Sequence, residues 1–160
     1  MTIVYEATQS RTEPSNIHAV ITALNRLFRS VDEKNWPQAE ACLAPRVLLD
    51  LTSLGGGEPE NTTGSAVVDG WREGLSHLEA IHHQAGNYEV DVHGEEANAS
   101  CYGIAYHFLP NDTGRNTRTF VGTFDFHLCK HRGGWQVDQL RYNLKFLDGN
   151  ADLEGREGSG

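Results

Sequence analysis

The feature that most constrains the fold is a change of hydrophobic period near residue 80. Before it, apolar residues recur every three or four positions, which is the spacing of one helix face. After it, long segments alternate apolar and polar residues, as strands with one buried face do. Helices gathered before a run of strands predict an α+β domain in which the helices pack on one face of an antiparallel sheet.

The chain of 160 residues has the size of one domain. We expect one domain over 15–148, with a flexible N-terminus over 1–14 and a flexible tail over 149–160. Segment 54–64 contains Gly55-Gly56-Gly57 and predicts a loop that closes the domain as a mobile lid. The expected elements are a helix starting at Ser15 or Asn16, a short helix after Asn35, a strand over 47–51, a helix over about 65–78, and strands over about 81–93, 97–109, 118–131 and 134–147.

The four long strands are expected to form a curved antiparallel meander shaped as a cone around the helices. Hairpin turns are expected at Asn111–Gly114 and Arg132–Gly134. A sheet that curls around helices leaves an open apolar pocket. The side chains expected inside it are Leu24, Phe28, Trp71 and Leu75.

Composition excludes several partners. The formal net charge of −9 repels phosphate backbones and anionic lipid, so nucleic acid and membrane are not expected partners. Three cysteines without a CxxC pair, together with no signal-peptide pattern at the N-terminus, predict reduced thiols in a cytoplasmic protein. The eight histidines form no pattern typical of a metal site, and no phosphate-binding or dinucleotide motif is present, so neither metal nor cofactor is expected.

Asp32 is the first candidate for chemistry. It follows Phe28 by four residues and Leu24 by eight, so it continues the buried stripe of the first helix. A carboxylate on a buried stripe needs a partner. The alternative is that Asp32 belongs to the last turn of the helix and meets solvent.

His82 is the second candidate. Tyr88, Val90 and Val92 mark the even positions of its strand as apolar, so strict alternation turns His82 toward the pocket and His83 away from it. A bulge at Gly86 would reverse this parity. An inward histidine is either a satisfied core residue or a base whose tautomer is fixed by a carboxylate such as Asp32.

Further polar residues lie on the later strands. His107 alternates with the small residues Gly103 and Ala105, which would leave room for a ligand, so it is either a second acid/base group or exposed. Asp125 and His127 are expected on an exposed or subunit-facing surface. Arg141 is expected either to steer an anionic substrate or to pair with Asp138.

Three local segments resemble the SnoaL-like branch of the nuclear-transport-factor-two-like superfamily. Segment 30–36, Ser-Val-Asp-Glu-Lys-Asn-Trp, resembles the end of the first helix in scytalone dehydratases. Segment 80–87 resembles the strand that carries the catalytic histidine in those enzymes and in hexachlorocyclohexane dehydrochlorinases. Gly133-Gly134-Trp135 with Leu140-Arg141 resembles the last hairpin of both.

The resemblance implies His82 as the base that takes a proton from carbon, Asp32 as its orienting carboxylate, and His107 as the second pocket histidine. A tyrosine precedes the aspartate in scytalone dehydratases, whereas this chain has Val31. A polarising hydroxyl would therefore come from another residue. The residues expected to bind substrate are Trp71, Tyr102, Tyr106, Arg141 and Tyr142.

The sequence thus predicts a cofactor-free enzyme with an Asp-His dyad in an apolar pocket. It would be a lyase of the dehydratase or dehydrohalogenase type, or a related isomerase or cyclase, acting on a small apolar or aromatic substrate. Two alternatives remain, a non-catalytic module that binds an apolar ligand and a structural small subunit of a ring-hydroxylating dioxygenase. Cones of this kind usually assemble through the outer face of the sheet, so a homodimer or homotrimer is expected.

Overall fold

The computed structural model describes residues 15–156. The N-terminus over 1–14 and the last part of the tail, 157–160, lie outside the described residues. The helices are α1 (Asn16–Asp32), α2 (Trp36–Ala41), α3 (Thr52–Gly55) and α4 (Gly64–Leu75). The strands are β1 (Leu43–Asp50), β2 (Glu60–Thr63), β3 (Ala80–His93), β4 (Glu96–Phe108), β5 (Thr117–His131) and β6 (Gly134–Gly149).

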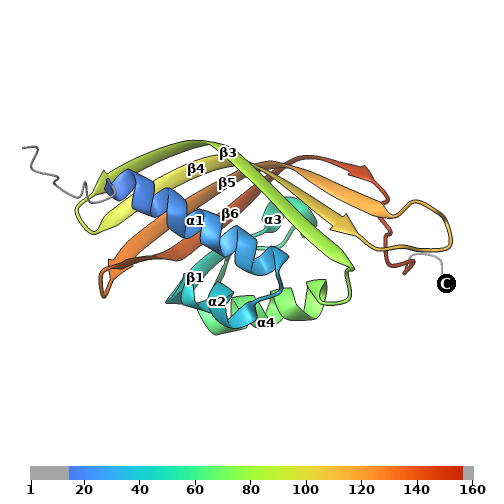
Figure 1. The fold of residues 1–160 in the computed structure, drawn as a ribbon, viewed down its shortest axis with the longest axis horizontal. Coiled ribbons are helices and arrows are strands. Elements are labelled where there is room, and N and C mark those ends of the chain that lie inside the picture. Colours follow the sequence, from blue (N-terminus) through green and yellow to red (C-terminus); the bar gives the residue numbers. More distant parts are fainter. Residues whose placement is uncertain (1–14, 157–160) are drawn as a thin grey trace, which may run out of the picture.

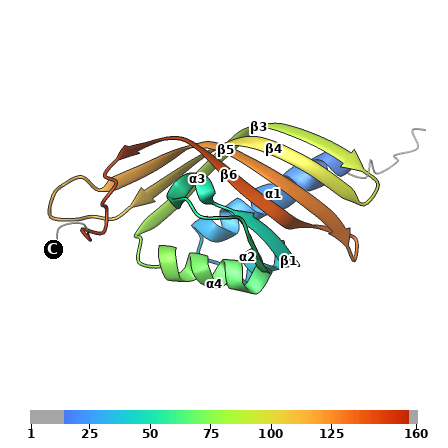
Figure 2. The ribbon, with the colours of Figure 1, turned by 180° about the vertical axis from the view of Figure 1, so that it is seen from behind.

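The six strands form one sheet in the order β2-β1-β6-β5-β4-β3. Strands β3 to β6 are the antiparallel meander that alternation predicts, and β1 joins the edge of β6 in parallel. The sheet is long and strongly curved, with α1 lying along its inner side (Figure 1). Seen from behind, α3 and β1 lie beside β6 (Figure 2). The predicted α+β class with a curved, unclosed sheet is confirmed.

The helices begin where the sequence provides caps. The hydroxyl of Ser15 accepts the backbone N–H of His18, and the side chain of Asn35 accepts that of Gln38. Thr63 caps α4 in the same way through the N–H of Ala66. Each cap satisfies one of the amide donors that the first turn of a helix leaves free, which is typically worth about 1 kcal/mol.

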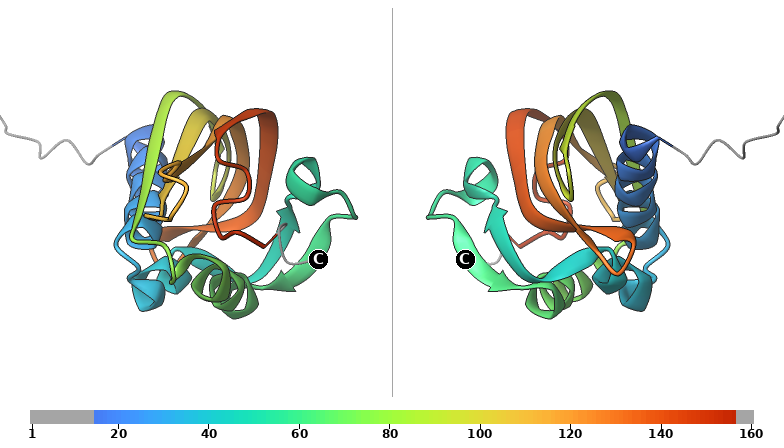
Figure 3. Two further views of the ribbon diagram at one scale, coloured as in Figure 1. Left: turned by 90° about the vertical axis from the view of Figure 1, so that its right-hand side faces the viewer. Right: turned by 90° about the vertical axis from the view of Figure 1, so that its left-hand side faces the viewer.

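The core lies between α1 and the inner face of the sheet. Leu24 of α1 and Leu128 of β5 are fully buried, and Phe28 stacks edge-on against Phe124 with ring centroids 5.1 Å apart. A Cβ atom at Gly103 would lie 2.2 Å from the Phe124 ring, so β4 needs glycine where this ring crosses it. The end views show the strands curling over α1 and α4 (Figure 3).

A bulge interrupts β3. The four residues from Gly86 to Glu89 on β3 face only three, Tyr102 to Ser100, on β4, and Asn87 has a φ of 53°. One extra residue reverses which side chains point inward. The parity of β3 therefore changes at this point.

Two segments differ from the sequence expectation. The region 54–64, expected to be a mobile lid, instead contains the end of α3 and the strand β2, which pairs with β1. The tail expected to be flexible from 149 continues into a turn in which Leu153 is 2% exposed against Leu78 and Ile81. The physical reason for the ordered turn after 149 is that Leu78, Ile81 and Leu153 bury one another in a second small core. Within residues 15–156, no helix is long and apolar enough to cross a bilayer.

Candidate active site

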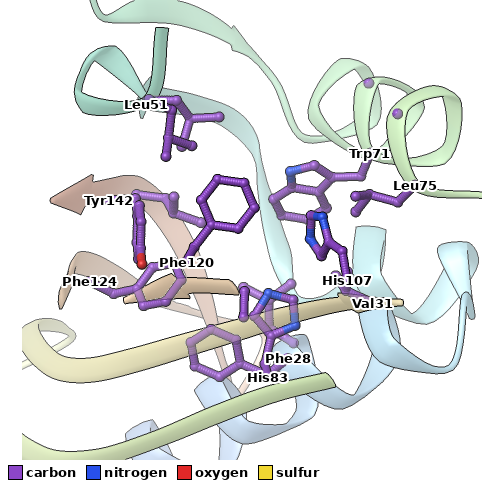
Figure 4. A pocket seen from close by; sticks show the side chains of 16 residues that line it. Phe28, Val31, Leu51, Trp71, Leu75, His83, His107, Phe120, Phe124 and Tyr142 are labelled. Carbon is purple, nitrogen blue, oxygen red and sulfur yellow. The ribbon is translucent and has the colours of Figure 1, made fainter. Parts of the chain in front are cut away.

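The curl of the sheet encloses a cavity of about 270 Å³ between α1, α4 and the inner faces of β3 to β6. Its wall is almost entirely apolar and aromatic, and the imidazoles of His83 and His107 reach it from two neighbouring strands (Figure 4). The lining residues are Leu27, Phe28, Val31, Leu51, Leu54, Gly70, Trp71, Gly74, Leu75, His83, Ala105, His107, Phe120, Phe124, Leu140 and Tyr142.

Asp32, the last residue of α1, contacts the histidine at position 83. Its Oδ1 lies 2.6 Å from Nδ1 of His83, and the backbone N–H of His83 donates to both carboxylate oxygens, at 3.2 and 3.0 Å. Both side chains are about 15% exposed. The carboxylate is therefore held by three contacts from a single residue of β3.

This contact sets the tautomer of His83. An ionised carboxylate only accepts hydrogen bonds, so in the neutral imidazole of His83 the proton is on Nδ1 and the lone pair is on Nε2. Within residues 15–156, Nε2 of His83 has no hydrogen-bond partner. The ring of Phe28 packs 5.5 Å away, centroid to centroid, and restrains the imidazole. The arrangement presents a free imidazole nitrogen to an apolar cavity.

The expectation that His82 faces the pocket and meets Asp32 is wrong. His82 is exposed on the outer face of the sheet, where its ring lies 6.2 Å from that of Tyr106. The bulge after Gly86 explains the error, because Tyr88 and Val90 beyond it point inward at even positions while Ile81 and His83 before it point inward at odd ones. The Gly86-Asn87 pair marks the position of this bulge in the sequence, because both residue types tolerate the backbone angles that a bulge needs.

His107 lines the cavity from the neighbouring strand β4, two residues beyond Ala105, which is the direct cross-strand partner of His83. Nη2 of Arg118, on the neighbouring strand β5, lies 3.1 Å from its Nδ1. Burial, followed by the charges of Arg118 and His83, lowers the pKa of His107 to about 4. His107 is therefore neutral at physiological pH.

The predicted substrate-binding residues separate into two groups. Trp71 and Tyr142 line the cavity, whereas Tyr102, Tyr106 and Arg141 do not. Tyr102 is 55% exposed, and alternation along β4 places it and Tyr106 opposite the inward Ala105. Arg141 pairs with Asp50 across 3.0 Å rather than with Asp138.

Tyr142 is the one of the three candidate tyrosines that reaches the cavity. It is 4% exposed, its hydroxyl donates to the Gly103 carbonyl at 3.4 Å, and burial raises its pKa to about 12. Its hydroxyl thus stays protonated. On the outer face, Asp125 is exposed and Nδ1 of His127 contacts Asp138 at 2.6 Å, so these residues are not part of the cavity.

Some functional residues were missed by sequence reasoning. Phe120 and Leu51 line the cavity without any motif to mark them, and Arg118 acts on His107 through a cross-strand pair that only the register of β4 and β5 reveals. Among the described residues no three His, Cys, Asp or Glu side chains gather as ligands for a metal ion. Cys42, Cys101 and Cys129 are free thiols.

Comparison with known proteins adds a family and several folds. The family model of the SnoaL-like domain matches residues 13–141. No curated protein matches the chain. The structure is similar to the Kfla4162 protein of Kribbella flavida, with a TM-score of 0.80 and 20% identity over 84% of this chain and 93% of that one.

Two further structures are similar at lower identity. A scytalone dehydratase candidate from Novosphingobium aromaticivorans has a TM-score of 0.71 and 14% identity, covering 84% of this chain and 87% of its own. The hexachlorocyclohexane dehydrochlorinase LinA-type3 from Novosphingobium barchaimii has a TM-score of 0.67 and 11% identity, with coverages of 84% and 89%. At such identities the likeness concerns the fold.

Proposed function

Because the chain belongs to the SnoaL-like domain family, we propose that its cavity is the active site of a lyase that removes a proton from carbon. The reaction is an elimination of the dehydratase or dehydrohalogenase type, and isomerases and cyclases that begin with the same proton transfer are its nearest variants. The observation that carries the proposal is the 2.6 Å contact between Asp32 and His83 at the wall of an apolar cavity.

His83 is the base in this reaction. Its Nε2 takes the proton of the substrate C–H bond, and the electron pair of that bond forms the new carbon–carbon double bond. The leaving group, a hydroxide or a halide, departs from the adjacent carbon with its bonding pair. Asp32 offsets the positive charge that develops on the imidazole and keeps the ring in the productive orientation.

His107 and Tyr142 supply hydrogen-bond donors. With Nδ1 facing a guanidinium, His107 carries its proton on Nε2 and donates it as a hydrogen bond without giving it up. Tyr142 becomes a second donor when its hydroxyl exchanges the 3.4 Å hydrogen bond to the Gly103 carbonyl for one to the substrate. Donors fixed in advance in a dry site stabilise charge that develops on a substrate oxygen or on a leaving group.

The cavity wall defines the substrate class. Trp71, Phe120 and Phe124 provide broad aromatic surfaces, and the described residues that line the wall include no Lys, Arg, Asp or Glu. A charged substrate would lose its hydration there without a counter-charge. The proposed substrate is therefore small, uncharged and largely apolar, with a cyclic or aromatic body.

Assembly and location remain predictions. We propose a homodimer or homotrimer that forms through the outer face of the sheet and resides in the cytoplasm. A stable dimer would bury more than about 1,000 Å². Light scattering that gives a mass near 17.7 kDa at micromolar concentration would contradict the assembly.

The test is a screen in D₂O with cyclic β-hydroxy ketones and chlorinated cyclohexanes, followed by NMR for loss of the acidic C–H and for appearance of the alkene. His83→Gln and Asp32→Asn should abolish or strongly reduce turnover. His82→Gln is the matched control, because it makes the same change one residue away on the outer face. Equal turnover in all three variants would contradict the proposed base and favour the alternative of a ligand-binding module.

A further inference from the structure

Arg118 contacts Nδ1 of His107, the ring nitrogen that is turned away from the cavity. The two residues are direct cross-strand partners on β4 and β5, with Nη2 of Arg118 at 3.1 Å from Nδ1 of His107. A guanidinium has five N–H donors, no acceptor, and does not lose its proton in proteins. Nδ1 must therefore be the unprotonated nitrogen, and the proton of neutral His107 is on Nε2.

Arg118 is itself held by a carboxylate from the end of the chain. Its Nη1 lies 2.8 Å from Oε2 of Glu154 and its Nη2 lies 2.9 Å from Oε1, which is a two-pronged ion pair with both side chains about 15% exposed or less. The hydrogen bonds from Arg118, with a further contribution from His77, lower the pKa of Glu154 to about 2. Glu154 is thus ionised and fixes the guanidinium in one orientation.

The turn that carries Glu154 is anchored next to this pair. Leu153 is 2% exposed and packs with Leu78 and Ile81, and Nε2 of His77 lies 3.1 Å from Glu154. A buried leucine beside a buried ion pair orders a segment whose composition predicts a flexible tail. The Leu153 anchor therefore brings the Glu154 carboxylate to the back of the catalytic cavity.

We propose that Arg118 and Glu154 are a positioning pair that fixes His107 as a neutral hydrogen-bond donor to the substrate, which makes the C-terminal turn a working part of the site. The inference rests on the proposed function for the role of His107 as a donor. The charged and titratable groups that act on His107 are Arg118, His83, Glu154 and His77. The pair touches His107 and not the cavity, so neither residue is assigned a chemical step.

The experiment is ¹⁵N NMR of histidine-labelled protein without substrate, from pH 7 to pH 4. In the wild type, His107 should have a protonated Nε2 and a bare Nδ1, while His83 should show the opposite pattern. Arg118→Met should release the tautomer of His107 into exchange and raise its titration midpoint by about one pH unit or more, because one cause of its depressed pKa is removed. Glu154→Gln should also loosen the tautomer, because Arg118 loses the carboxylate that orients it, but it should lower the titration midpoint of His107, because the charge of Glu154 raises that pKa.

Arg141→Met is the matched control, because it removes an arginine that pairs with Asp50 outside the cavity. It should leave the His107 signals unchanged. If Arg118→Met does not fold, Arg118→Lys keeps the charge but not the two-pronged geometry and should still loosen the tautomer. A protonated Nδ1 in the wild type, or an unchanged His107 spectrum in the Arg118 variant, would overturn the inference. Failure of the substrate screen would count against the proposed function alone, since this measurement needs no turnover.

Discussion

Two histidines share one cavity, and the groups behind them carry opposite charge. On the α1 side, the Asp32 carboxylate accepts a hydrogen bond from Nδ1 of His83 at 2.6 Å. On the β5 side, the Arg118 guanidinium donates to Nδ1 of His107 at 3.1 Å. The same side chain thus presents the cavity with a lone pair from β3 and with an N–H from the neighbouring strand β4.

The difference teaches that the residue behind an imidazole decides its chemical role. A carboxylate stabilises the imidazolium and favours a base, whereas a guanidinium opposes a second positive charge and favours a neutral donor. Each imidazole is held by its own partner, Asp32 or Arg118, and this fixes which of its nitrogens carries the proton. A proton acceptor and a proton donor can therefore lie a short distance apart without neutralising each other.

The largest loss of turnover is expected when His83, the proton acceptor, is replaced. His83→Gln removes the nitrogen that takes the substrate proton, and turnover should fall by up to about 10⁴-fold, the upper range for a general base. Initial rates on the substrate identified in the screen measure this. His82→Gln, on the outer face, should change them less than about twofold, and a comparable loss there would break the comparison.

Asp32→Asn should have the next largest effect. The amide keeps the shape of the carboxylate but cannot offset the charge of an imidazolium, and its NH₂ can donate to Nδ1 and so reverse the tautomer of His83. We expect a loss of about 10³-fold in kcat with little change in KM. Far-ultraviolet circular dichroism should stay unchanged, and a variant that keeps wild-type kcat would show that Asp32 has only a structural role.

The depressed pKa of His107 should make the free energy of unfolding depend on pH in the acid range. The pKa of His107 is about 4 in the folded protein, against an ordinary 6.5. Above about pH 6.5 His107 is therefore neutral in both the folded and the unfolded chain, and its contribution to the free energy of unfolding is fully present. As the pH falls toward about 4, the unfolded chain binds the proton first, and the free energy of unfolding should decrease by at most about 3 kcal/mol. Urea titrations at pH 7 and 4.5 measure the slope, which His107→Gln should flatten.

The smallest effect concerns the donor itself. His107→Gln replaces one N–H donor with an amide that is less well fixed, and we expect a loss of about 10²-fold in turnover, the usual cost of losing one preorganised donor. The pH dependence of kcat/KM near neutrality should keep its shape, because His107 does not titrate there. If the decrease of kcat/KM at acid pH disappeared in His107→Gln, His107 rather than His83 would be the base.

The sequence by itself determined the fold class and much of the site. The change of period near residue 80 predicts helices before an antiparallel meander, and the caps at Ser15 and Asn35 fix where α1 and α2 begin. The spacing Leu24, Phe28, Asp32 places a carboxylate at the inner end of α1, where the structure has it against β3. These features are local, so periodicity alone reveals them.

Only the tertiary structure decided which histidine is paired and what lies behind the other one. One extra residue in β3 turns His83 inward and His82 outward; Gly86 marks where such a bulge can form, but only the pairing of β3 with β4 shows that it does. Arg118 and Glu154 are separated by 36 residues and meet because Leu153 finds a place in the second core. Register and long-range burial are properties of the packed chain, because they depend on partners that no sequence window contains.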